Sequence, residues 1–198
     1  PACAWFIASK LYNFFVSDTP DEGAIQTLAD EFQRSNGNIE SVMRTMFLSG
    51  FFQSEQVRFA RIKSPAEMVA GTARLAGSHR STDWSIVGLA MDANFMGQEI
   101  LNPPSVEGWH TGTEWIDTGS LVERINSAAQ EVGNPNHPGI KEIIRRIRDG
   151  QDVLSPKEFV DRCLDLAGGV RVGEATSQHL TGYAAAQGDL RFDRDELV

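Results

Sequence analysis

Cysteine, basic charge and long apolar runs are all scarce in this sequence. Cys3 and Cys163 are the only cysteines among 198 residues, and their wide separation suggests neither a metal site nor a structural disulfide. No run approaches the roughly 18 apolar residues that suggest a membrane span. The 27 Asp and Glu outnumber the 18 Lys and Arg, which gives a net charge of −9. Because nucleic acids are bound mainly through clustered Lys and Arg, we expect neither a nucleic-acid partner nor a membrane span.

Catalytic and cofactor motifs are equally scarce. No glycine-rich phosphate loop follows a strand, and there is no G-x-S-x-G turn. A catalytic triad with distant members stays open, because such residues meet only in the fold. His79, His110 and His137 fall in predicted loops, where solvated side chains are the simplest interpretation. The sequence therefore predicts no metal site and no cofactor.

Long stretches of alternating apolar and polar residues are also missing, while helical periodicity recurs along the chain. The sequence predicts an all-α fold of about eight to nine helices in a compact array. A linker over residues 133–138 divides a helical core, 1–132, from a C-terminal helical extension, 133–198, whose tail from Gly188 is expected to fray. The predicted helices cover 2–16, 20–35, 39–47, 65–76, 82–97, 119–132, 139–149, 156–167 and, more weakly, 174–187.

Three predicted helices begin with the same pattern, [ST]-P-x-E. The first residues of the three motifs are Thr19, Ser64 and Ser155, and Ser120 begins a weaker version without proline. In this pattern the hydroxyl accepts from an unpaired helix N–H, and the glutamate reaches back to the backbone N–H of the cap residue. We therefore expect these residues to cap their helices.

The first predicted helix is apolar on nearly every side, which predicts a central, buried helix. The chain starts at Pro1 without methionine or an export signal, and this start suggests a fragment or a processed product. A helix of this kind at a chain start needs something to cover it.

Basic residues gather in two places. One predicted helix carries Lys141, Arg145, Arg146 and Arg148, which we interpret as a solvated face rather than a polyanion site. A smaller cluster of Arg58, Arg61 and Lys63 precedes the cap at Ser64. Within it Lys63 either contacts a buried carboxylate or is an ordinary surface lysine, and the second interpretation is favoured.

Residues 101–121, LNPPSVEGWHTGTEWIDTGSL, interrupt the helices. Pro103 and Pro104 prevent a helix, and a long ordered loop of this kind is usually functional or pinned to a core. We predict that Trp115 clamps the loop to the core and that Trp109 is partly exposed. Whether the loop is a plug alone or also lines a site stays open. The candidate binding residues are Asn102, Glu107, Trp109, His110, Glu114, Trp115 and Asp117, with Lys63 and Glu67 as secondary candidates.

Several motifs resemble a known family. These are Met96-Gly97-Gln98, residues 102–109 (NPPSVEGW), 115–119 (WIDTG) and 121–126, the opening residues 1–16, and Lys63-Ser-Pro-Ala-Glu67. Over about residues 1–130 the chain resembles the C-terminal part of the bacterial domain-of-unknown-function family number eighteen hundred. The resemblance implies a helical protein with several hundred further residues upstream, frequent export to the periplasm or cell surface, and frequent gene pairing with a sulfatase-like family. It supplies no established activity and no catalytic residue.

The leading functional hypothesis is a non-enzymatic helical module for protein–protein or cell-surface assembly. Its partner would be another protein or the upstream part of its own polypeptide. The alternative is a hydrolase-like or carbohydrate-associated enzyme whose site around residues 101–119 is shared with an upstream region. In that case a tryptophan would stack on a sugar, and Glu107, His110, Glu114 or Asp117 would act as acid, base or ligand. Exposed tryptophans beside a carboxylate favour the enzyme, and tryptophans buried with satisfied N–H groups favour the assembly module.

Overall fold

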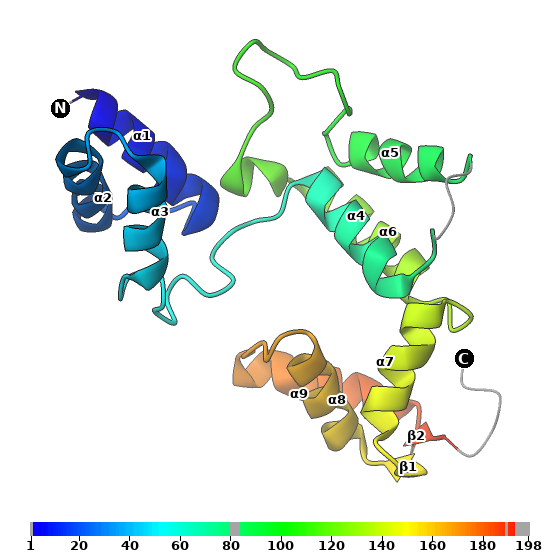
Figure 1. The fold of residues 1–198 in the computed structure, drawn as a ribbon. Coiled ribbons are helices and arrows are strands. Elements are labelled where there is room, and N and C mark those ends of the chain that lie inside the picture. Colours follow the sequence, from blue (N-terminus) through cyan, green and yellow to red (C-terminus); the bar gives the residue numbers. More distant parts are fainter. Residues whose placement is uncertain (1, 80–83, 189, 193–198) are drawn as a thin grey trace. The chain divides into compact units, whose positions relative to one another are not determined.

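The computed structural model describes residues 2–79, 84–188 and 190–192, and in these ranges it is all-α, as predicted (Figure 1). The minor exceptions are a 3₁₀ helix, η1, and a two-stranded antiparallel ribbon. The predicted start of the fifth helix, residue 82, lies outside the described residues, and the helix is described from Ile86. The elements are α1 Ala2–Phe15, α2 Glu22–Arg34, α3 Ile39–Leu48, α4 Pro65–Ala76, α5 Ile86–Phe95, η1 Gly112–Trp115, α6 Thr118–Val132, α7 Pro138–Arg148, β1 Val153–Leu154, α8 Pro156–Leu166, α9 Glu174–Ala186 and β2 Leu190–Arg191.

The chain divides into two compact units. Unit 1 contains Pro1–Met68 and Ala90–Arg124, and unit 2 contains Val69–Leu89 and Ile125–Val198. Helices α4, α5 and α6 contribute residues to both units. The boundary between residues 132 and 133 that the linker suggests stays a prediction.

Unit 1 is built on α1, which packs against α2, and α2 pairs in turn with α3 (Figure 1). One face of α1 is buried through Ala4, Ala8 and Tyr12. The small side chains of Ala4 and Ala8, one turn apart, let a second helix approach closely. The prediction of a central, buried helix is wrong for the other faces of α1. Phe6 and Phe14 are exposed, because the described packing covers one stripe of the helix.

A buried carboxylate joins α2 to α3. Glu31 accepts hydrogen bonds from the hydroxyl of Ser41 and from Nε of Arg34, the latter at 2.9 Å. These bonds, that of Ser41 first, hold the pKa of Glu31 below its usual value. The turn between the helices needs the left-handed region at Asn36 and Gly37, with φ of 53° and 82°. Helices α2 and α3 therefore form a helical hairpin.

The caps are confirmed at two of the predicted positions. The Ser64 and Ser155 hydroxyls each accept from the N–H three residues on, and Glu67 and Glu158 accept from the N–H of the serine. The prediction for Thr19 is wrong: Asp21 caps α2, because its carboxylate is the stronger acceptor for the N–H of Ala24. Ser120 does not begin α6 either, since the helix starts at Thr118.

Unit 2 contains α7, the ribbon, α8 and α9. Ile147, Leu154 and Phe192 form a core in this unit. Val153 pairs with Arg191 and Leu154 with Leu190. The fraying of the tail from Gly188 stays a prediction, since residues 189 and 193–198 lie outside the described residues. The burial of Phe192 supplies the free energy that holds this short strand in place.

Candidate functional site

The long loop of residues 96–117 is tied to α4 at its beginning. Gly97 adopts a φ of 94°, which ends α5 and turns the chain. The buried side chain of Gln98 then accepts a hydrogen bond from the backbone N–H of Ala66 at 2.8 Å, in the first turn of α4. A residue of the sequence motif therefore satisfies a helix N–H that has no partner within its own helix.

At its other end the loop lies against the connection that follows α1. Gly112 adopts a φ of 64°, and a Cβ atom there would lie 3.2 Å from Cγ of Asp18. Asp18 also accepts a hydrogen bond from the N–H of Ile62 at 2.9 Å, and its Oδ1 lies 3.9 Å from Nε of Arg61. Three segments far apart in sequence thus converge on one carboxylate.

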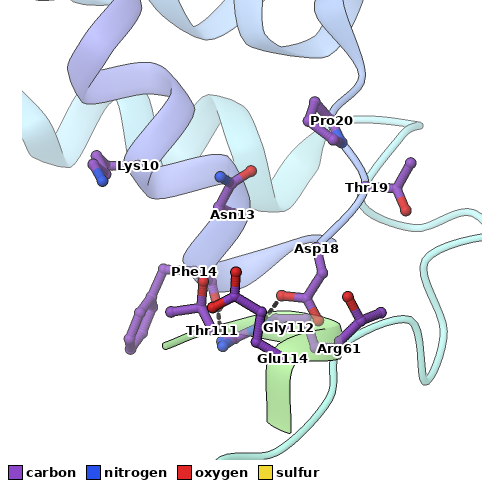
Figure 2. A pocket seen from close by; sticks show the side chains of 11 residues that line it. Lys10, Asn13, Phe14, Asp18, Thr19, Pro20, Arg61, Thr111, Gly112 and Glu114 are labelled. Carbon is purple, nitrogen blue, oxygen red and sulfur yellow. Dashed lines mark hydrogen bonds and ion pairs between the residues drawn. The ribbon is translucent and has the colours of Figure 1, made fainter. Parts of the chain in front are cut away.

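The convergence of these segments forms a cleft of about 470 Å³ (Figure 2). Arg61 donates a hydrogen bond to the carbonyl oxygen of Phe14, and its guanidinium lies 5.1 Å from the centre of the Phe14 ring. The side chains that line the cleft carry both charges and an aromatic ring, so it suits a segment with mixed polar and apolar groups. They include Lys10, Asn13, Phe14, Asp18, Arg61 and Glu114.

Of the seven loop candidates from the sequence, Glu114 lines this cleft. Its carboxylate lies 2.6 Å from Nδ1 of His110, and both side chains are mostly exposed. Asn102 donates instead to Glu99 at 2.7 Å, and Glu107 is exposed. The candidate polar residues are therefore spread along the loop and do not converge on one site.

The remaining loop candidates have structural surroundings. Trp115 is 5% exposed, as the clamp prediction requires, and its carbonyl oxygen accepts from the Ser120 hydroxyl at 2.9 Å. Trp109 is half-buried, and its indole nitrogen is buried without a hydrogen bond among the described residues. Asp117 caps α6: it accepts from the N–H of Ser120 at 2.8 Å, and this bond is the main reason that its pKa is lowered.

The secondary candidates and the second basic group have ordinary environments. Glu67 belongs to the cap of α4, and the side chain of Lys63 is exposed. On α7, Nε of Arg145 and of Arg146 lie 2.7 and 2.8 Å from the carboxylate of Glu142, whose pKa falls to about 2. These arginines form an exposed helix face paired with acid, as expected for a solvated surface.

Sequence patterns missed the residues that shape the site. Asp18 shows no pattern of its own, and Arg61 was noticed only as part of a small basic cluster, because their partners lie over 40 positions away in the sequence. Arg124 lies on α6 and is buried, where burial lowers its pKa. It donates to the carbonyl oxygen of Lys63 at 3.0 Å and thereby ties α6 to the segment before α4. A lone arginine in an amphipathic helix gives no signal of such a role.

A row of phenylalanines borders the cleft. Four rings form a chain of edge-on contacts in the order Phe14, Phe15, Phe47 and Phe52. The centres of successive rings are 4.7, 5.7 and 5.0 Å apart. Phe52 packs on the unit 1 core, whereas Phe14, Phe15 and Phe47 are 59%, 38% and 39% exposed. We call these four residues the aromatic ridge. Because Phe14 also lines the cleft, ridge and cleft form one continuous surface.

In the described ranges, no group of three or more His, Cys, Asp or Glu is arranged to hold a metal ion, and no helix is long and apolar enough to cross a membrane. The features that stand out are a mixed-charge cleft and an exposed aromatic surface on an all-α scaffold, which define a helical protein with a candidate binding surface. The chain belongs to the family described as "Protein of unknown function (DUF1800)", whose model matches residues 1–195. The match reaches beyond the 130 residues over which the motifs resemble the family. No curated protein and no solved structure matches the chain.

Proposed function

We propose that this chain is a protein–protein assembly module and that its partner covers the aromatic ridge. The observation that carries the proposal is the exposure of three phenylalanines of unit 1 whose rings contact one another. Contiguous exposed apolar patches on soluble proteins mark interaction sites, and aromatic side chains supply much of the binding energy at interfaces. Phe52 packs against the core of unit 1 and holds the ridge in place, so the ridge is a preformed surface.

The cleft gives this surface specificity. The cleft carries charges of both signs beside Phe14: the positive ones belong to Lys10 and Arg61, and the negative ones to Asp18 and Glu114. A partner that places an apolar side chain on Phe14 brings neighbouring polar groups within reach of these charges. Charged groups at the rim of an apolar contact select the partner and speed the encounter more than they add affinity.

The partner in this proposal is either another protein or a further segment of the same polypeptide, as the family resemblance implies. We further propose that the assembly forms in the periplasm or at the cell surface, which fractionation of the producing cells would test. The carbohydrate-associated or hydrolase-like alternative is less favoured. Trp115 is buried, and the candidate acids of the loop do not converge on an exposed tryptophan face.

Photo-crosslinking in the cells that make the protein tests the proposal. A photoreactive phenylalanine analogue replaces Phe14, and in a second variant it replaces the exposed Glu40 of α3, also in unit 1. We expect Phe14 variants to yield one dominant covalent adduct whose partner mass spectrometry identifies, and Glu40 variants to yield little. Adducts of equal yield at both positions, or none at Phe14, would contradict the proposal. The identity of the adduct distinguishes a separate protein from a segment of the same chain.

A further inference from the structure

Helices α8 and α9 pack against each other within unit 2 (Figure 1). A further cavity lies between these two helices. Its volume of about 440 Å³ is in the range of small-molecule sites, roughly 300–1,000 Å³. We call it the α8–α9 groove. Its apolar walls come from Phe159, Cys163 and Leu164 of α8, Leu180 and Ala184 of α9, and Leu190 of β2.

The lining of the groove is almost free of polar groups. Among the described residues, none that lines it is charged, and the polar side chains are those of Tyr183 and Gln187 besides the Cys163 thiol. Burial raises the pKa of Cys163, so this thiol is neutral and behaves as a small apolar group. A sugar, a phosphate or a carboxylate would lose its hydration here without gaining hydrogen bonds, which is unfavourable.

The groove continues the core of unit 2. Phe159, Cys163 and Leu190 line it and also pack against the core around Leu154. The pairing of Leu154 with Leu190 fixes one wall. On α9, Leu180 and Ala184 lie about one helical turn apart and both line the groove. Ala184 is also the buried residue of this helix. The walls are therefore held by the fold, while the space between them is not filled by described side chains.

We propose that the α8–α9 groove binds the hydrocarbon chain of an aliphatic ligand, with the polar head group outside the groove. A hydrocarbon chain buries no polar group, so it matches a lining without charges. It would extend the apolar core outward between two helices whose positions are already set. The inference is independent of the aromatic ridge, which belongs to unit 1.

Protection of Cys163 from alkylation tests the groove in the unmodified protein. Both cysteines are free thiols, with Cys163 partly buried in the groove and Cys3 exposed on α1, so Cys3 is an internal control. Dodecanoate, kept below its micelle concentration, should slow iodoacetamide labelling of Cys163 about tenfold at ten times its dissociation constant, by mass action. Labelling of Cys3 should not change. Mass spectrometry of the two cysteine peptides gives both rates.

Two variants test whether the ligand binds in the groove itself. Ala184→Phe fills the groove and should abolish the protection, whereas Ala185→Phe adds the same bulk at an exposed neighbouring position and should keep it. If circular dichroism shows that Ala184→Phe does not fold, the inference is judged from the labelling rates of Cys163 and Cys3 in the unmodified protein. Dodecanol should protect as dodecanoate does, because the chain is what binds. Phosphatidylcholine vesicles that protect Cys163 would identify a membrane lipid as the source of the chain.

Two results would overturn the inference. One is labelling of Cys163 that dodecanoate and dodecanol leave unchanged, or slow equally at Cys3. The other is protection of Cys163 that rises with protein concentration in the absence of ligand, which would assign the groove to a second copy of the chain. Neither result bears on crosslinking from Phe14, so this inference and the proposed assembly function fail separately.

Discussion

Trp115 is predicted to hold the long loop on unit 1, and Trp115→Ala measures that role. The side chain is 5% exposed. An aromatic side chain buries about 150–250 Å², which at about 25 cal/mol per Å² corresponds to roughly 4–6 kcal/mol. Truncations of large aromatic residues in cores cost about 3–5 kcal/mol. Because domains are stable by about 5–15 kcal/mol, we expect Trp115→Ala to remove a large part of the stability of unit 1.

The assay is urea denaturation followed by tryptophan fluorescence in a Trp84→Phe background. Trp84 is 90% exposed and is the tryptophan of unit 2, so its removal leaves a signal from unit 1 alone. Trp109→Ala, at a half-buried position of the same loop, is the matched comparison and should have a smaller effect. A loss below about 1 kcal/mol in Trp115→Ala, within the range of ordinary substitutions, would refute the clamp.

Three further predictions concern stability. Ser64→Ala and Ser155→Ala should each lower the free energy of unfolding by about 0.5–2 kcal/mol through the lost cap, measured by chemical denaturation, and two unchanged values would refute the caps. Gly139→Ala should lower the melting temperature, because its Cβ would fall on the carbonyl oxygen of Leu75; an unchanged melting temperature would contradict that close approach. The pKa of Glu31 is lowered in the folded state, so its contribution is complete above pH 4.5 and is lost as the pH falls through the folded pKa. Glu31→Gln should therefore differ from wild type in unfolding free energy at neutral pH and approach it in acid, and a gap constant with pH would contradict this.

Local sequence patterns predicted the helices well. They did not predict which residues far apart in the sequence come together in the fold. The caps at Ser64 and Ser155 follow from residues within one turn, so the sequence suffices. At α2 two acceptors compete, and Asp21 displaces Thr19 because a carboxylate binds the helix N–H more strongly. The phenylalanines of α1 were expected to be buried, because composition alone does not tell which faces of a helix find a partner.

The residues of the candidate site were likewise predicted only where a local pattern marks them. The loop was singled out from its prolines, glycines and tryptophans, and Glu114 does line the cleft. Asp18 and Arg61 were not singled out as cleft residues, since they meet only when the connection after α1, the segment before α4 and η1 come together. The ribbon that buries Phe192 joins residues about 40 positions apart and is too short to give a strand pattern.

Hydroxyl-radical footprinting tests the central claim, the burial of the aromatic ridge in an assembly, most directly. The oxidation rates of Phe14 and Phe47 are compared between the purified chain and the protein in the cells that make it. Phe59, exposed in the same unit but outside the ridge, is the control. The account predicts that Phe14 and Phe47 are protected about fivefold or more in cells while Phe59 is not, as expected when a partner occupies most copies of the ridge. Equal rates for the ridge in both preparations would contradict it.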